Sequence, residues 1–267
     1  MDMYVPLATA QLGGRIADFR WSQRARGSRW LLVGLVLGLG VLLIALGFQA
    51  VPQAAPILLG TGLLLLPFGV AMAFFSFRQG THPPPLTLYE QGLVMQRGRR
   101  VHLVRYEEIA AMWEQILWQA GRRNILPRRT HVYTLQTRDR TTLRLNDRFA
   151  DIARAGALVQ QEVLRRRLPE AAAAYQAGGA IPFGPLTVSR MGLARGKDVL
   201  PWAEVASVSI AEGHYRGTAV WTYKLRVMRM GKRRPWLELD IAQIPNSSVL
   251  LALLKEIGVT PDTMPVQ

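Results

Sequence analysis

One long run of hydrophobic positions dominates the first third of the chain. No Asp, Glu, Lys or Arg occurs in residues 30–77, and prolines interrupt the run near the segment VPQAA. Residues 30–50 and 56–77 are therefore two apolar segments, each long enough to cross a hydrocarbon core of about 30 Å as a helix. The pattern predicts a helical hairpin with two transmembrane spans.

Basic positions flank this run on both sides. They precede the first span, within the N-terminal segment 1–29, and follow the second, while the connection between the spans carries no charge. Because positive side chains stay on the cytoplasmic side, we expect both termini to lie in the cytosol. A cleaved secretory signal is disfavoured. The apolar core of such a signal is shorter than residues 30–50, and in this chain a second apolar segment follows the first. The flanking bases are Arg15, Arg20, Arg24, Arg26, Arg29 and Arg78.

Gly34 and Gly38 form a GxxxG pattern inside the first span. Small residues at this spacing allow two helices to approach closely. Two interpretations stay open: the glycines pack the first span against the second span of the same hairpin, or they join two copies of the chain.

Beyond residue 77 the pattern changes to short alternating runs. Residues 78–85 form a proline-rich linker, which holds the chain extended. Runs rich in Val, Leu, Tyr, Trp and Thr follow, separated by turn residues, and they predict antiparallel strands. The segment FADIARAGALVQQEVLRRRL then has apolar residues at helical spacing, and Asn146 or Asp147 can cap it. These elements define a first β unit at residues 86–170.

The same succession occurs again over residues 178–260. LTLYEQGL begins at Leu86 and LTVSRMGL at Leu186, an offset of 100 residues that also separates Asn146 from Asn246, the predicted cap of the second helix. YEEIAAM and WAEVASV match at an offset of 96. The period far exceeds that of solenoid repeats, so the chain contains a duplicated domain, and each unit is closed by a C-terminal helix.

Gly92 and Gly192 occupy the same point of the two copies. The first hairpin of each unit is expected to turn there, where a residue with positive φ is often needed. We therefore predict that both are structural turn glycines.

The strand meander, the aromatic-x-Glu-Ile/Val strand entry and the closing helix together resemble the pleckstrin-homology-like (PH-like) superfold. LYEQGL, RYEEIAAM, PFGPLTVSRMGL, LPWAEVASV and IPNSSVLLALL carry the resemblance. The whole chain resembles an uncharacterised bacterial family with a two-helix membrane hairpin and tandem PH-like domains. The resemblance implies a membrane-anchored α+β protein and no reaction. The first hairpin contains Glu90 and no base, whereas inositide-binding PH domains have bases there.

The sequence offers no catalytic or metal-binding constellation. It contains no cysteine, and its four histidines have no metal-ligand spacing. Glu107, Glu108 and Glu204 occur at equivalent strand entries, which favours a structural role. We therefore expect a protein that is not an enzyme and that binds no cofactor or metal.

The net charge of +15 suggests an anionic partner surface. The candidate contacts for anionic lipid headgroups lie in two Arg-rich loops, and the cluster at residues 165–167 is a further basic group at a predicted helix end. The alternative for each is a solvated loop, or a favourable helix-dipole placement for 165–167. Nucleic acid is not favoured, because the aromatics lie at expected core positions of strands. The candidate contacts are Arg122, Arg123, Arg128, Arg129, Lys232, Arg233 and Arg234.

These patterns together predict a non-catalytic, membrane-anchored scaffold or adaptor that presents tandem PH-like domains to the cytosol and binds a protein partner. Two alternatives stay open. One is a sensor of anionic lipid surfaces that acts through the Arg-rich loops. The other is an accessory subunit of a membrane complex that acts through the transmembrane hairpin.

Overall fold

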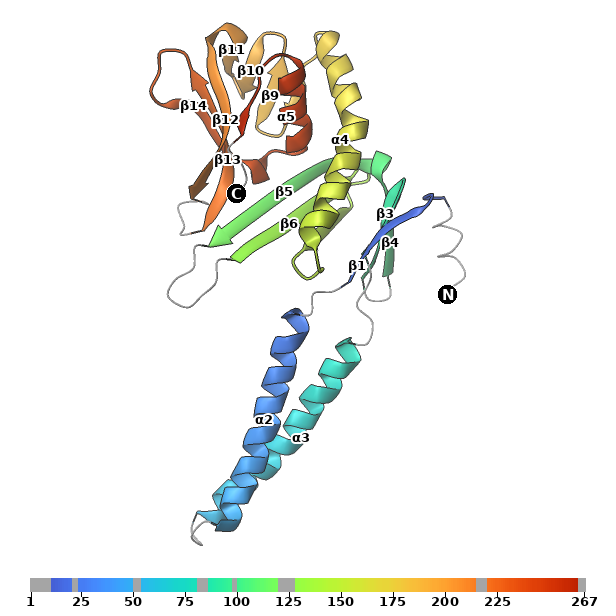
Figure 1. Cartoon of the computed structure of the whole chain (residues 1–267), viewed down its shortest axis with the longest axis vertical. Coiled ribbons are helices and arrows are strands. Elements are labelled where there is room, and N and C mark those ends of the chain that lie inside the picture. Colours follow the sequence, from blue (N-terminus) through green and yellow to red (C-terminus); the bar gives the residue numbers. More distant parts are fainter. Residues whose placement is uncertain are drawn as a thin grey trace.

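The computed structural model describes residues 11–20, 24–49, 54–80, 86–97, 100–119, 128–214 and 220–263 (Figure 1). Over these residues the chain forms a helical hairpin that projects from two antiparallel β units. The predicted α+β class is confirmed.

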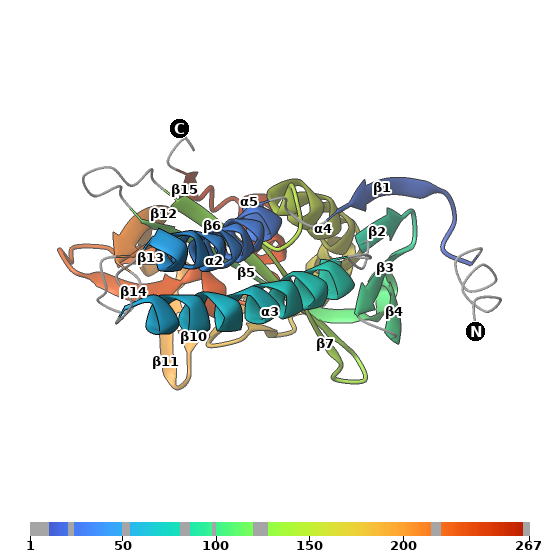
Figure 2. The ribbon, with the colours of Figure 1, turned by 90° about the horizontal axis from the view of Figure 1, so that it is seen from below.

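The hairpin consists of α2 (Arg24–Gln49) and α3 (Ala55–Gly80), which lie side by side (Figures 1 and 2). Both helices are long and apolar enough to cross a membrane. Only 17% of Leu32–Gln49 and 11% of Ala55–Phe74 is buried, whereas the core helix of a soluble protein is mostly buried. The predicted pair of apolar helices is therefore present, and each helix is longer than its apolar segment.

Glycines bring the two helices together, but they are not the glycines of the GxxxG pattern. A Cβ added to Gly47, Gly62 or Gly69 would come within 2.8 Å of a side-chain atom on the other helix. A Cβ added to Gly34 or Gly38 would have no described atom within 4 Å. The interpretation that Gly34 and Gly38 pack the hairpin is thus wrong, because they point away from α3.

The first β unit has a four-stranded sheet, ordered β1-β2-β3-β4, followed by two long strands, a five-residue strand and a helix. Alternate strand residues such as Leu88, Leu93 and Leu135 are fully buried, together with Ala155 and Val159 of the helix. The elements are β1 (Arg15–Phe19), β2 (Leu86–Tyr89), β3 (Gly92–Arg97), β4 (Arg100–Arg105), the 3-10 turn η1 (Tyr106–Glu108), β5 (Ile109–Gln119), β6 (Arg128–Thr137), β7 (Thr142–Asn146) and α4 (Ile152–Gln176).

The first strand of this unit comes before the helical hairpin. β1 pairs antiparallel with β2, and Phe19 lies opposite Leu86. Phe19 is 4% exposed and belongs to the core of the first unit. The unit therefore does not begin at residue 86, because Arg15–Phe19, inside the predicted N-terminal segment, belongs to it. The helical hairpin is an insertion between two paired strands.

The second β unit repeats this order. It has a four-stranded sheet, β11-β10-β9-β8, then three longer strands and a helix, with a short last strand that pairs parallel to β12. The elements are β8 (Ile181–Phe183), β9 (Leu186–Ser189), β10 (Gly192–Arg195), β11 (Asp198–Pro201), η2 (Trp202–Glu204), β12 (Val205–His214), β13 (Trp221–Arg229), β14 (Pro235–Asp240), η4 (Ile241–Gln243), α5 (Ser247–Glu256) and β15 (Asp262–Thr263).

The point of insertion is visible when the two units are compared. Phe183 lies opposite Leu186 across β8 and β9, as Phe19 lies opposite Leu86 across β1 and β2. In the second unit only Gly184 and Pro185 join these strands. The first unit carries the whole helical hairpin in place of this two-residue turn.

Gly92 and Gly192 are the first residues of β3 and β10. Gly192 has a φ of 148°, but the φ of Gly92 is not positive. An added Cβ would collide with the carbonyl oxygen of Val104 at Gly92 and with that of Leu200 at Gly192. Close approach of the next strand is thus the constraint that both positions share.

The two closing helices begin 95 residues apart, because Asp151 and Asn246 hold the cap positions with φ values of 56° and 52°. Neither side chain caps its helix. The prediction that Asn146 or Asp147 caps the first helix is wrong, since Asn146 ends β7 and the Asp147 carboxylate accepts a hydrogen bond from the His131 backbone N–H.

Candidate functional site

The two β units share one helix. α4 continues through Pro169 to Gln176, beyond the predicted end of the first unit. Val159 and Val163 lie in the core of the first unit, and Ala171 lies in that of the second. Residues 171–176, which lie between the predicted bounds of the two units, are therefore part of α4, and the helix holds the two cores together (Figure 1).

The cluster Arg165–Arg167 lies inside α4 and contacts its surroundings. Arg165 pairs with Glu162 at 2.7 Å. The Arg166 guanidinium lies 5.9 Å from the Tyr106 ring centroid, and burial raises the pKa of Tyr106 to about 12. Arg167 donates to the carbonyl oxygen of Ile109 at 2.7 Å. These contacts connect α4 to the first unit, and the helix-end placement predicted for the cluster is wrong.

The sheets of the two units also join. β13 pairs with β5 where Trp221 lies opposite Trp118, and the two indole rings stack with centroids 5.5 Å apart. The His214 ring lies 4.1 Å from Trp221. The result is a seven-stranded sheet that contains strands of both units.

A second contact ties the start of α5 to β5. Asn246 accepts a hydrogen bond from the Met112 N–H through its side-chain oxygen at 2.9 Å and donates its own N–H to the Met112 carbonyl oxygen at 2.7 Å. Its side-chain amide also donates to the Ala110 carbonyl oxygen at 3.2 Å. The side chain predicted to cap α5 thus binds the edge of a strand in the other unit.

Between these two contacts, β5 faces the second unit across a gap. In an antiparallel strand, alternate residues direct their backbone groups to opposite edges. The backbone groups of Met112 and Trp118 point to the edge of β5 that faces the second unit. Glu114 and Ile116 alternate in step with them, so their backbone groups point to the same edge. Side chains alternate between the two faces. β5 therefore supplies one wall of a cavity on each face of the sheet.

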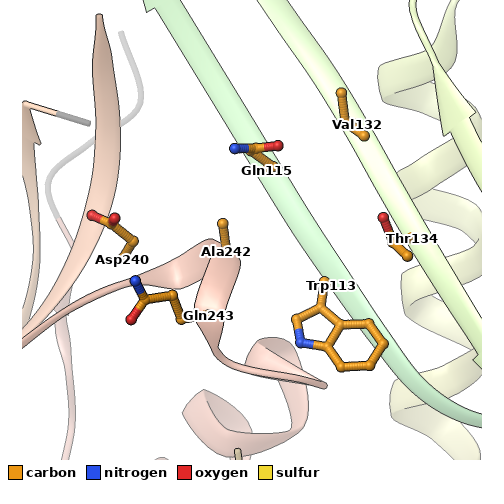
Figure 3. Close-up of a pocket in the computed structure, with 7 residues that line it drawn as sticks. All are labelled: Trp113, Gln115, Val132, Thr134, Asp240, Ala242 and Gln243. Atoms are coloured by element: carbon orange, nitrogen blue, oxygen red, sulfur yellow. The ribbon is translucent and has the colours of Figure 1, made fainter. Parts of the chain in front are cut away.

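The cavity on the outer face has a volume of about 260 Å³, and we call it the inter-unit pocket. In Figure 3 the side chains of β5 and β6 lie on one side of it and those of the second unit on the other. Its lining residues are Trp113, Gln115, Val132, Thr134, Asp240, Ala242 and Gln243.

Asp240 is the acidic residue of this pocket. It is only 8% exposed, and its carboxylate receives no hydrogen bond from any residue within the described ranges. The cross-strand neighbour of Asp240 is Lys224, whose ammonium donates instead to Glu238 at 2.9 Å. The sequence does not reveal Asp240, because the residues that line the pocket with it are far away in the chain, and Trp113 looks there like an ordinary core position.

The cavity on the inner face is also about 260 Å³ and is mainly apolar, with Glu114 in its wall. Gln160 donates to the Glu114 carboxylate at 3.3 Å. Burial raises the pKa of Glu114, and hydrogen bonds from Tyr133 and Gln160 oppose that rise. Glu114 thus takes part in a buried polar contact between β5 and α4.

The predicted lipid-contacting bases lie at two separate places. Arg122 and Arg123 lie outside the described residues, and the side chain of Arg128, the first residue of β6, is also not described. Arg129 is exposed and lies opposite Trp118. Figure 1 shows these ends of β5 and β6 on the side of the β units that faces α2 and α3.

Lys232, Arg233 and Arg234 are exposed in the turn between β13 and β14. This turn lies at the end of the second unit farthest from α2 and α3 (Figure 1). By strand order it corresponds to the β6–β7 turn of the first unit and not to the β5–β6 connection. The two basic loops are therefore not at equivalent positions of the two units.

Predicted structural carboxylates make specific contacts at the strand entries. Glu108 accepts a hydrogen bond from the Arg105 backbone N–H at 3.1 Å, and Glu204 pairs with Arg229 at 2.6 Å. No group of His, Asp or Glu suited to a metal ion occurs among the described residues.

Comparison with known proteins places the chain in a family. A search of curated proteins finds no match. The family of unknown function DUF6585 matches residues 2–262, nearly the whole sequence. The chain therefore belongs to this family.

Proposed function

We propose that the protein is a non-catalytic scaffold anchored in the bacterial inner membrane, with two cytosolic PH-like units that bind a protein partner. The observation that carries this proposal is the insertion of the apolar hairpin between the paired strands β1 and β2. A hairpin inserted in this way connects to the first β unit at both of its ends, so the unit is held close to the membrane surface.

The PH-like assignment is supported by the strand order. In each unit, four short strands form one sheet, three further strands follow, and a C-terminal helix closes the core. The orientation is supported by the bases that flank α2 and α3 and by the uncharged connection between the helices.

The scaffold role is supported by the way the units are joined. The shared helix α4, the Trp118–Trp221 pair and the Asn246 contacts hold the two units in one arrangement. A fixed arrangement presents a partner with one surface made of both units, and little conformational entropy is lost when the partner binds it. The carboxylates at the strand entries take part in structural contacts, which supports a non-catalytic role.

Cysteine labelling tests the topology, because the chain has no cysteine of its own. Ala54→Cys, in the connection between α2 and α3, should react with an impermeant maleimide from the periplasmic side. Glu256→Cys, at the end of α5, should react only after the inner membrane is opened. The reverse pattern would refute the proposed orientation.

Site-specific photo-crosslinking in cells tests where a partner binds. A photoreactive residue in place of Met191, which is 73% exposed on the second unit, should crosslink one defined protein. The same residue in place of Leu63, which is 69% exposed on α3, is the matched position in the hairpin. Crosslinking only from Leu63 would favour the accessory-subunit function over the scaffold.

An anionic-lipid sensor is the second candidate, and it is favoured by the basic start of β6, the end of that strand that lies on the side facing α2 and α3 (Figure 1). Each base near an anionic surface contributes about 1 kcal/mol. A fluorophore on Gln119→Cys in full-length protein should be quenched by headgroup spin labels more strongly in anionic than in neutral bilayers, and salt should reduce the difference. The difference in quenching between anionic and neutral bilayers should disappear in a variant with Ser at Arg122, Arg123, Arg128 and Arg129.

The matched control for this lipid experiment changes Lys232, Arg233 and Arg234 to Ser. These bases lie at the distant end of the second unit, so the quenching should stay as in the wild type. Equal quenching in neutral and anionic bilayers would exclude the sensor function.

A further inference from the structure

The carboxylate of Asp240 is in an unusual position for a buried charge. Asp240 is 8% exposed, and the part of the chain that the structure describes supplies it with neither a hydrogen bond nor an ion pair. Buried charges in proteins are normally paired, because burial removes their hydration. Lys224, the base opposite Asp240, is paired with Glu238. The Asp240 carboxylate therefore remains available for a cation from outside the chain.

The rest of the inter-unit pocket suits a particular kind of cation. Trp113 supplies an indole, the aromatic side chain that attracts cations most strongly. Gln115, Gln243 and Thr134 supply side-chain oxygens that accept hydrogen bonds. No basic side chain is among the residues that line the cavity. The chain as a whole is strongly basic, so an acidic pocket without a base is a local exception.

We propose that the inter-unit pocket binds an arginine side chain of the partner protein. The proposal deepens the proposed function and rests on it. A guanidinium is planar, stacks on aromatic faces and presents several N–H donors in one plane, whereas an ammonium is compact and more strongly hydrated. The acceptors around Trp113 therefore favour arginine over lysine. A cavity of about 260 Å³ has room for one such side chain and not for a folded element.

Binding in this pocket depends on both units. Trp113 and Gln115 lie on β5 of the first unit, and Asp240 and Gln243 belong to the second (Figure 3). The arginine recognises the assembled pair of units and stabilises their arrangement, since ligands that bind only the assembled state favour it.

The test uses full-length protein in detergent micelles and soluble probes that differ in one group. N-acetyl-arginine amide is titrated beside the citrulline analogue, which has a neutral urea in place of the guanidinium, and beside N-acetyl-lysine amide. Calorimetry should show that wild-type protein binds the arginine probe about tenfold more tightly than either other probe. Equal binding of arginine and citrulline probes, or no binding at all, would overturn the proposal, and equal binding of lysine would overturn the choice of a guanidinium.

Variants at the pocket assign the effect to its residues. Asp240→Asn and Trp113→Leu should each weaken binding of the arginine probe about tenfold, while Trp113→Phe should keep part of it. Glu256→Gln, which removes an exposed carboxylate from α5, should bind as the wild type does. Retained arginine preference in Asp240→Asn would refute the assignment of the carboxylate.

Thermal unfolding provides a second measurement that does not depend on probe affinity. Without probe, Asp240→Asn should unfold at a temperature no lower than that of wild type, because the described residues give the carboxylate no hydrogen bond or ion pair to lose. A lower melting temperature would show that Asp240 is paired within the chain and would count against the proposal. The crosslinking experiment at Met191 is independent of the pocket, because Met191 is not among the residues that line it, so a scaffold that uses another contact would still crosslink its partner.

Discussion

Phe19 and Leu86 face each other across two paired strands, although the complete helical hairpin separates them in sequence. The equivalent pair in the second unit, Phe183 and Leu186, is joined by a two-residue turn. The relationship identifies the helical hairpin as an insertion into a β hairpin and leads to the first two predictions.

Phe19→Ala should destabilise the first unit by about 3–5 kcal/mol, the usual loss when a buried Phe is truncated. Phe19 is 4% exposed and packs in the first core. Chemical unfolding of the detergent-solubilised chain measures the effect. Ile16→Ala, on the same strand but 50% exposed, is the matched control and should change stability by less than about 0.5 kcal/mol. Similar losses in both variants would show that β1 is not part of the core.

Replacing residues 20–85 by Gly-Pro, as at Gly184 and Pro185 in the second unit, should yield a folded protein without the hairpin. The replacement keeps β1 joined to β2 by a short turn. Size-exclusion chromatography in the absence of detergent should show a monodisperse species, and near-UV circular dichroism should show fixed aromatic packing. A chain that starts at Leu86 lacks β1, and we expect it to aggregate because the edge of β2 is exposed. Equal behaviour of the two proteins would contradict the insertion.

Gly62→Leu should separate α2 from α3. A Cβ at Gly62 already comes within 2.7 Å of Ile44 and 2.8 Å of the Gly40 carbonyl oxygen, so a larger side chain has no space. The distance between spin labels on the two helices should increase in the variant. Gly38→Leu adds the same side chain where the described atoms leave open space, and it should leave the distance unchanged. A change in Gly38→Leu alone would reverse the assignment of the packed face.

Glu114→Gln should stabilise the protein near neutral pH. Burial raises the pKa of Glu114, so the folded state holds this proton more tightly than the unfolded state does. The ionised carboxylate therefore destabilises the fold above the folded-state pKa, and the penalty disappears as pH falls below the ordinary carboxyl range. Melting temperatures measured as a function of pH should show a gain for Glu114→Gln that shrinks on acidification.

Asp139→Asn is the control of opposite sign. Hydrogen bonds from Thr137 and Thr141 lower the pKa of Asp139, so its ionised form stabilises the fold at neutral pH. The stabilisation is present above the unfolded-state pKa and is lost as pH falls through the folded-state pKa. The variant should therefore melt at a lower temperature than wild type near neutral pH, and the difference should vanish in acid. Shifts of the same sign in both variants would contradict the assignment.

Local patterns in the sequence were sufficient to predict several helices and strands. Residues 30–77 carry no charge, and a charge-free run of that length forms helices in almost any context. The match between Leu86–Leu93 and Leu186–Leu193 corresponds to equivalent strands, β2–β3 and β9–β10. These features depend on residues close together in the chain, so periodicity and composition are enough to predict them.

The tertiary structure decided which strand completes the first unit, how far α4 extends and where an acidic pocket forms. β1 is short, and its partner β2 follows the hairpin, so no local pattern connects them. α4 passes Pro169 because its last turns pack on the second core, and such packing overrides local propensity. Asp240 is an ordinary polar position in the sequence, and only the tertiary structure buries this residue and places it in one pocket with Trp113 of the other unit.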